Sequence, residues 1–123
     1  MDAIDTLSPK IFLIYHALQK GRRLTSSMGS GGKVDPMQVK LCDFSETYNC
    51  RLAYLLRKNL RKLDVHGGFR VVFSPEQVSK ESIIPVEGED NKRSTVGTSS
   101  FIPAIFGCML ASVVINELAA PQE

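Results

Sequence analysis

The chain has 123 residues, of which 43% are hydrophobic and 23% charged, and its net charge is +2. This size and composition are typical of one soluble domain, long enough to bury roughly two thirds of the surface of its unfolded chain. So small a net charge excludes an argument for nucleic-acid or membrane binding from bulk electrostatics, and such binding would need a local patch.

In chain order, the patterns predict the end of a strand at 3–4, a helix at 11–18, strands at 24–28 and 37–44, a helix at 45–63, a strand at 69–73, and a helix that begins after Ser99 or Ser100 and ends at Ala119. Strand, helix and strand within about thirty residues predict a right-handed crossover. We therefore expect an α/β fold with a mixed sheet and packed helices, as one domain over 1–123. Residues 77–98 are charged and poor in apolar side chains, which predicts a long mobile or crossover loop.

Two helices are apolar almost throughout. Ser8 and Pro9 predict the start of the first, Gly21 predicts its end, and its core at 11–18 should be covered on most sides. The segment 101–115 is shorter than the ~20 residues of a membrane span, so a buried core helix is expected there. We expect no membrane partner.

The chain has three cysteines, Cys42, Cys50 and Cys108, and no CxxC pair. This pattern disfavours a disulfide framework and predicts no zinc site, and we expect a reducing, cytoplasmic setting. Cys108 should be an inert thiol packed inside its helix. A nucleophilic thiol needs a nearby base or helix N-terminus, and Cys50 meets this requirement only loosely. No catalytic cysteine is therefore predicted. The acidic start lacks the basic region of a signal peptide.

The aspartates Asp2 and Asp5 follow the predicted strand end at 3–4 or lie beside it. Carboxylates at the carboxyl end of a strand in an open α/β sheet lie where such folds bind ligands, and two in one turn can hold a magnesium ion that bridges phosphates. The alternative is that both are turn and capping residues.

The glycine-rich segment 29–32 is a weak motif. Lys33 follows it, but the G-K-S/T ending of a phosphate-binding loop is missing, as is the spacing of a dinucleotide fingerprint. A tight connection is the simpler interpretation. The two histidines, His16 and His66, have no cysteine or second histidine at ligand spacing.

One face of the predicted helix at 45–63 is basic, through Arg57, Lys58, Arg61 and Lys62. These side chains could contact a phosphate backbone. A charged helix face is more often only solvated, and cations near a helix C-terminus also suit its dipole.

Five segments in succession resemble the C-terminal half of the ThiF/MoeB/HesA superfamily, whose fold is Rossmann-like and related to that of ubiquitin-activating enzymes. They are DAIDTLSPK, SSMGSGGKVDPMQVKLCD, RLAYLLRKNLRK, VVFSPE and GTSSFIPAIFGCMLASVVINEL. The resemblance implies transfer of AMP from ATP to a carboxylate with release of pyrophosphate. It makes Asp5 the catalytic residue that binds ATP and magnesium, with Asp2 as its neighbour, although the Asn that follows this aspartate in related members is Thr6 here.

The missing CxxC pairs and the missing thioester cysteine favour the dehydratase branch, which acts on threonylcarbamoyladenosine in tRNA. The resemblance then implies tRNA as a partner, a homodimer, and a sulfur-transfer or acceptor protein as a further possible partner. The nucleotide-binding half of the family has no counterpart here, so we expect an inactive fragment with an uncovered apolar sheet edge that self-associates. The alternative left open is a non-catalytic module for RNA binding, protein binding or dimerisation.

Overall fold

The computed structural model describes residues 1–79, 83–85 and 94–121. Its regular elements are the helices α1 (Leu7–Gln19), α2 (Arg51–Arg61) and α3 (Ile102–Ala119), the 3₁₀ helices η1 (Pro36–Gln38) and η2 (Phe44–Glu46), and the strands β1 (Thr25–Ser27), β2 (Lys40–Asp43), β3 (Arg70–Phe73), β4 (Ile83–Pro85) and β5 (Ser94–Val96). The expected mixed α/β fold is confirmed.

The main sheet has three strands in the order β1-β3-β2. Strand β1 is parallel to β3, and β2 is antiparallel to β3. Asp2 extends the parallel part of the sheet through an isolated bridge to Ser26 on the other side of β1. The strand, helix and strand predicted within about thirty residues correspond to Asp2, α1 and β1. A longer connection, which contains α2 and the antiparallel β2, joins β1 to β3.

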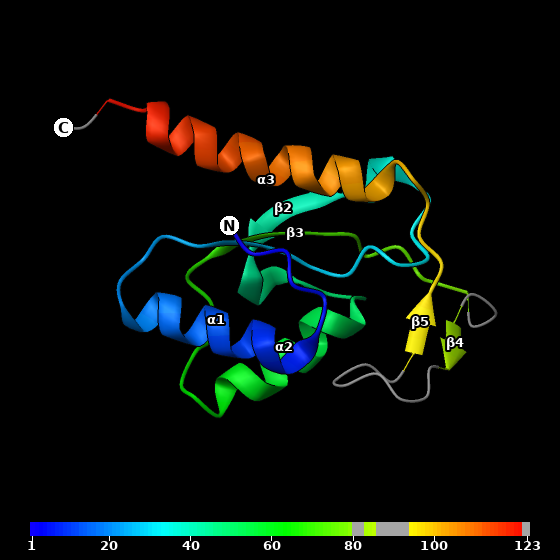
Figure 1. The fold of residues 1–123 in the computed structure, drawn as a ribbon, viewed down its shortest axis with the longest axis horizontal. Helices are drawn as coiled ribbons and strands as arrows, with labels where there is room; N and C mark the ends of the chain where they lie inside the picture. Colours follow the sequence, from blue (N-terminus) through cyan, green and yellow to red (C-terminus); the bar gives the residue numbers. More distant parts are fainter. Residues whose placement is uncertain (80–82, 86–93, 122–123) are drawn as a thin grey trace.

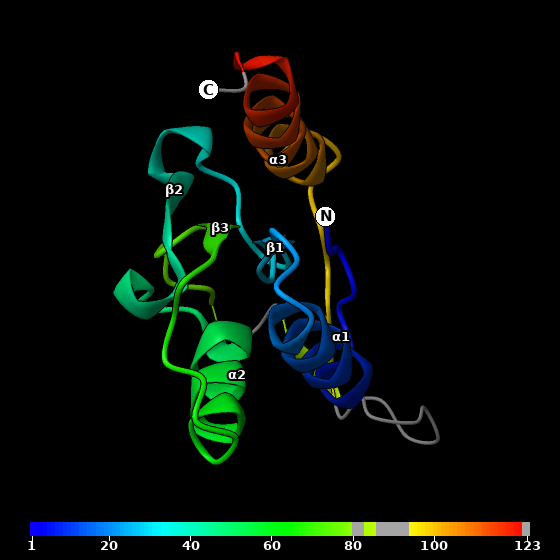
Figure 2. The same cartoon turned by 90° about the vertical axis from the view of Figure 1, so that its left-hand side faces the viewer.

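Helices cover both faces of this sheet, with α1 and α2 on one side and α3 on the other (Figures 1 and 2). Alternation along β3 divides the core, because Val71 and Phe73 face α1 and α2, whereas Val72 packs with Ile102, Phe106 and Leu110. The larger cluster includes the stacked rings of Phe44 and Phe69, whose centroids are 4.8 Å apart.

The second helix is shorter than predicted from residues 45–63. Asp43 and Glu46 form a capping box around η2, and Asn49 then adopts a left-handed φ of 49°. That conformation interrupts a helix, so α2 begins only at Arg51, with Cys50 as its N-cap. The predicted strand at 37–44 is also shortened, because Asp35 caps η1 within its first residues.

The expectation that α1 and α3 are covered on most sides is wrong. Helix α1 buries only Lys10 and Ile14, and Phe12 is 66% exposed. Helix α3 buries one stripe, Ile102, Phe106, Leu110 and Val113, on the sheet. Its outer face is open to solvent, so Cys108 is exposed rather than packed, and Leu118 is 68% exposed.

By length and composition alone, α3 is the one helix among the described residues that could cross a membrane, and 22% of its 18 residues are buried here. Core helices of soluble proteins pass the same test. In this structure α3 packs on the sheet, where its buried residues contact Val72.

The expected apolar sheet edge is also corrected. Strand β1, at one edge, consists of Thr25, Ser26 and Ser27, whereas α1 and α3 carry exposed apolar side chains such as Phe12, Ile115 and Leu118. Within 77–98, the structure places the short antiparallel pair β4 and β5. Of the rest of the predicted loop, residues 80–82 and 86–93 lie outside the described residues.

Candidate active site edge

Three connections leave the parallel part of the sheet at its carboxyl edge. They are the residues after Asp2 that lead to α1, the glycine-rich segment after β1, and Ser74–Glu76 after β3, all on the right in Figure 1. Open α/β sheets bind ligands outside this edge. The structure therefore brings together the predicted residue Asp5, the segment 29–32 and the SPE motif.

Asp2 pairs with Ser26 of β1 just before this edge, and the residue is only 1% exposed. Its Oδ2 accepts a hydrogen bond of 2.6 Å from Ser26 Oγ and lies 2.7 Å from Lys10 Nζ, and its Oδ1 accepts from the backbone N of Ile4. Lys10 Nζ also donates to the carbonyl of Ile4 at 2.8 Å. Both oxygens of Asp2 are thus engaged, and the buried pair fixes the backbone immediately before Asp5.

Burial lowers the pKa of Lys10, although the hydrogen bond and the charge of Asp2 act to raise it, as does the charge of Asp5. A lysine with no exposed side-chain surface is rare unless it is paired. Sequence reasoning missed this pair, because a lysine three residues into a helix reads as a solvated side chain.

Asp5 is exposed and lies one residue before Thr6, the N-cap of α1. The first turn of α1 has no acidic residue, so its positive dipole end is not neutralised there. A hard carboxylate oxygen beside a helix N-terminus suits a magnesium–phosphate ligand. No group of three or more potential metal ligands occurs in the described part of the chain.

The glycine-rich connection is held in place by Glu76. The Glu76 carboxylate accepts hydrogen bonds from the backbone N of Val34 and of Asp35, at 3.0 and 2.9 Å through Oε2. Lys33, only 4% exposed, donates from Nζ to the Glu76 carbonyl. Burial lowers the pKa of Lys33, while the charges of Cys50 and Glu76 raise it. The GKVD sequence is therefore a docked turn, and Lys33 does not point toward a phosphate site.

Replacing Glu76 by alanine should destabilise the chain by about 1–2 kcal/mol, because two backbone N–H groups lose a charged acceptor. Hydrogen exchange should show faster exchange at the amides of Val34 and Asp35. Gln77→Ala, at the exposed next position, is the control. Unchanged exchange at both amides in Glu76→Ala would contradict the assigned role.

The basic face of α2 is not uniform. Arg57 Nη1 donates to the carbonyl of Thr47 at 2.7 Å and also to its hydroxyl, so this guanidinium holds the chain that leads into α2. Lys58, Arg61 and Lys62 are exposed. Of the four candidates, these three remain available to a partner on this face.

The cysteines and histidines form no cluster. Cys50 is buried, Cys42 is half-buried with a thiol pKa raised by burial and by the carboxylates of Glu46 and Asp43, and Cys108 lies on the other side of the sheet. His66 is exposed and contacts Asp64, and His16 contacts the rings of Phe12 and Tyr15.

Fold and site thus define an open α/β sheet covered by helices on both faces, with an acidic residue at the carboxyl edge of its parallel strands. No protein-family model matches the chain. Curated relatives do, however: tRNA threonylcarbamoyladenosine dehydratase of Bacillus subtilis is 30% identical over 96% of this chain, and that of Escherichia coli is 27% identical over 98%. The chain is homologous to the tRNA threonylcarbamoyladenosine dehydratases, as its resemblance to the ThiF/MoeB/HesA superfamily implies.

Solved structures agree with this assignment. The Escherichia coli dehydratase in complex with AMP superimposes with a TM-score of 0.77 at 27% identity, over 95% of this chain and 46% of that one. Its complex with ATP gives the same TM-score at 25% identity. The chain spans about half the length of the two bacterial relatives, 49% and 51%.

Proposed function

We propose that this chain is the C-terminal half of an ATP-dependent tRNA threonylcarbamoyladenosine dehydratase, inactive without an N-terminal nucleotide-binding half. The observation that carries the proposal is the match of nearly the whole chain to about half of several dehydratases. The reaction would transfer AMP from ATP to the carboxylate of the threonylcarbamoyl group and release pyrophosphate. Ring closure would then expel AMP.

Within this proposal Asp5 is the residue of the chain that would hold ATP and magnesium. It is exposed at the carboxyl edge and precedes α1, so its carboxylate is accessible to a ligand. Asp2 would position Asp5 rather than bind the ligand itself, because both carboxylate oxygens of Asp2 are already engaged within the chain. A bound magnesium ion would supply charge neutralisation at the phosphates.

The proposed partner is tRNA, contacted by the exposed residues Lys58, Arg61 and Lys62 of α2. A homodimer, a cytoplasmic location and a sulfur-transfer or acceptor protein as further partner complete the proposal. Exposed apolar side chains on α1 and α3, such as Phe12 and Leu118, support association with further protein surface.

Replacing Arg61 and Lys62 together by alanine should weaken tRNA binding and lower its salt dependence. Each lost phosphate contact changes the slope of log K against log salt by ~0.9 for a duplex, so the pair should reduce it by about two. Arg22→Ala, an exposed arginine outside α2, is the control. An unchanged slope would show that these side chains do not contact phosphates and that this face of α2 is only solvated.

The test of the proposed function is calorimetric titration with ATP and magnesium. It compares this chain with a chimera in which the half of the Bacillus subtilis dehydratase not matched by this chain precedes Met1. Binding by the chimera alone is expected. Binding by neither would favour the non-catalytic module, and binding by the chain alone would contradict the shared nucleotide site.

A further inference from the structure

The outward face of α2 carries an aromatic ring among its cations. The exposed side chains of the helix and its C-cap are Tyr54 and four basic residues, Arg51, Lys58, Arg61 and Lys62. Arg51 and Lys58 are three and four residues from Tyr54 along the helix, so their Cβ atoms lie about 5–6 Å from that of the tyrosine. The tyrosine is 57% exposed. Its ring therefore stands in the middle of the basic surface.

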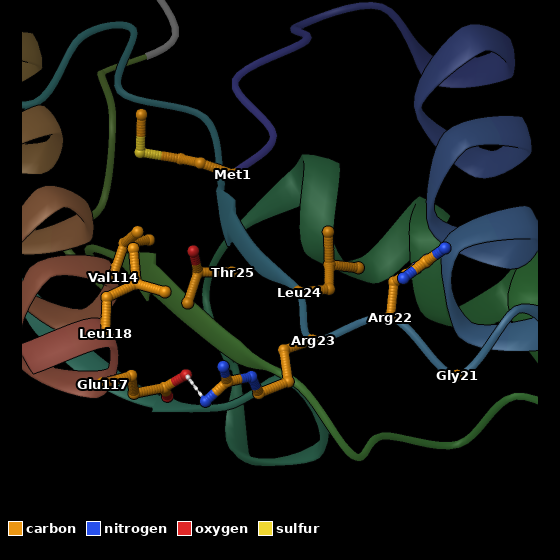
Figure 3. Close-up of a pocket in the computed structure, with 9 residues that line it drawn as sticks. All are labelled: Met1, Gly21, Arg22, Arg23, Leu24, Thr25, Val114, Glu117 and Leu118. Atoms are coloured by element: carbon orange, nitrogen blue, oxygen red, sulfur yellow. Dashed lines mark ion pairs between the residues drawn. The ribbon is translucent and has the colours of Figure 1, made fainter. Parts of the chain in front are cut away.

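The four cations are not neutralised by neighbours. None of them forms an ion pair in the part of the chain that the structure describes, and α2 contains no acidic residue. Other cations of the chain do have partners: Lys10 pairs with Asp2, and Arg23 pairs with Glu117 at 3.6 Å beside the cleft between β1 and α3 (Figure 3). The outward face of α2 is therefore a surface that attracts a polyanion.

Tyr54 differs from the other exposed tyrosine of the chain. The Tyr48 hydroxyl accepts a hydrogen bond of 2.8 Å from Lys40 Nζ, and its ring packs edge-on against Phe73 with the centroids 5.6 Å apart. Among the described residues, the side chain of Tyr54 makes no hydrogen bond and no ring contact. Its ring is therefore available to a ligand.

We propose that this face of α2 binds unpaired RNA, with one base stacked on Tyr54 and the neighbouring phosphates held by Lys58 and Arg61. The choice of RNA rests on the proposed function, and the inference adds which part of the RNA is bound. Bases within a duplex stack on one another, so a side chain can stack on a base only in a loop, a bulge or a single strand. Stacking is possible with every base, so Tyr54 would favour unpaired RNA of any sequence.

Two other polyanions could meet the cations of this face. An RNA duplex would leave Tyr54 without a stacking partner, because its bases are already stacked. A glutamate-rich peptide offers carboxylates but no aromatic face, so it too would use the cations alone. Both serve as competing ligands in the test.

The experiment is titration of this chain with a labelled oligouridine of about eight nucleotides and with an abasic oligomer of the same length, which has the same phosphates but no bases. Oligouridine should bind about 10-fold or more tightly than the abasic oligomer. Tyr54→Ala should remove this difference without changing the salt dependence, because no phosphate contact is lost. Lys58→Ala should keep the difference and lower the slope of log K against log salt by ~0.7, the value for one contact to a single strand.

Three further variants separate stacking from other effects at this position. Tyr54→Phe should bind like the parent chain, because the ring is retained. Tyr54→Trp places the only tryptophan of the chain on α2, and its fluorescence should be quenched by oligouridine but not by the glutamate-rich peptide. Phe12→Ala removes an aromatic ring that is 66% exposed on α1 and should bind normally.

Equal affinity for oligouridine and the abasic oligomer would overturn the proposal, as would undiminished binding by Tyr54→Ala or no binding of oligouridine at all. A loss of duplex binding in Tyr54→Ala as large as the loss for oligouridine would also contradict it. The proposed function fails separately. Stacking on Tyr54 without ATP binding by the chimera would retain the RNA site and exclude the chemistry, whereas ATP binding by the chimera without stacking would retain the proposed function.

Discussion

Replacing Lys10 by methionine should destabilise the chain by about 3–5 kcal/mol, because it leaves the Asp2 carboxylate buried without its counter-charge. Neither side chain of the pair has any exposed surface, so water cannot take over the lost interaction. The loss is a large fraction of the stability of a domain of this size. Urea unfolding measured at neutral pH would show it as a lowered midpoint.

The matched control is Lys20→Met, which makes the same chemical change at the exposed C-cap of α1 and should alter stability by less than about 0.5 kcal/mol. Combining Lys10→Met with Asp2→Ala should recover much of the loss, because removing both charges leaves neither one buried alone. A Lys10→Met variant as stable as Lys20→Met would show that the pair contributes nothing to the fold.

Replacing Asp5 by asparagine should lower AMP transfer in the chimera with the nucleotide-binding half by about 100-fold or more, with little change in unfolding free energy. The carboxylate is exposed, so water screens its charge, including its interaction with Lys10, and the effect on stability should be small. A charge-stabilising group at a phosphoryl site, by contrast, is worth 10²–10³ in rate. ATP–pyrophosphate exchange and urea unfolding would measure the two quantities on the same sample.

Asp64→Asn is the control for this substitution, since Asp64 is exposed and its left-handed φ of 59° also suits asparagine. It should leave both quantities unchanged. Full pyrophosphate exchange in Asp5→Asn would remove Asp5 from the mechanism. A large loss of stability in Asp5→Asn would instead make it a second structural carboxylate, like Asp2.

Local patterns predicted the elements whose signals are confined to a few residues. The strand at 69–73 appears as β3 at Arg70–Phe73, and Gly21, with a φ of 63°, ends α1 as expected. The beginning of α2 could not be predicted as well. Helix α2 begins later than predicted because Asn49 adopts a left-handed conformation. The segment before the helix is held by a hydrogen bond from Arg57 to Thr47, ten residues earlier in the chain.

Tertiary contacts decided the rest of the site. Nothing local shows that Lys33 and Val34 meet Glu76, more than forty residues away, so the glycine-rich segment could be predicted as a connection but not as a docked turn. Similarly, α3 is apolar all round in sequence, and only its packing on Val72 shows which stripe is buried. Asp5 could be proposed as a site residue because it belongs to a motif, whereas the burial of Lys10 could be recognised only with its partner Asp2 in view.

The pairing of Asp2 with Lys10 also determines how the chain would respond to losing its first two residues. Such trimming would remove the carboxylate that pairs with the buried Lys10 ammonium group, and burial already acts to lower the pKa of Lys10. The folded form would then bind fewer protons than the unfolded form over the range between the lowered pKa and the ordinary value of 10.5. Folding would be coupled to proton release there, and the trimmed chain would gain stability as the pH rises toward that value.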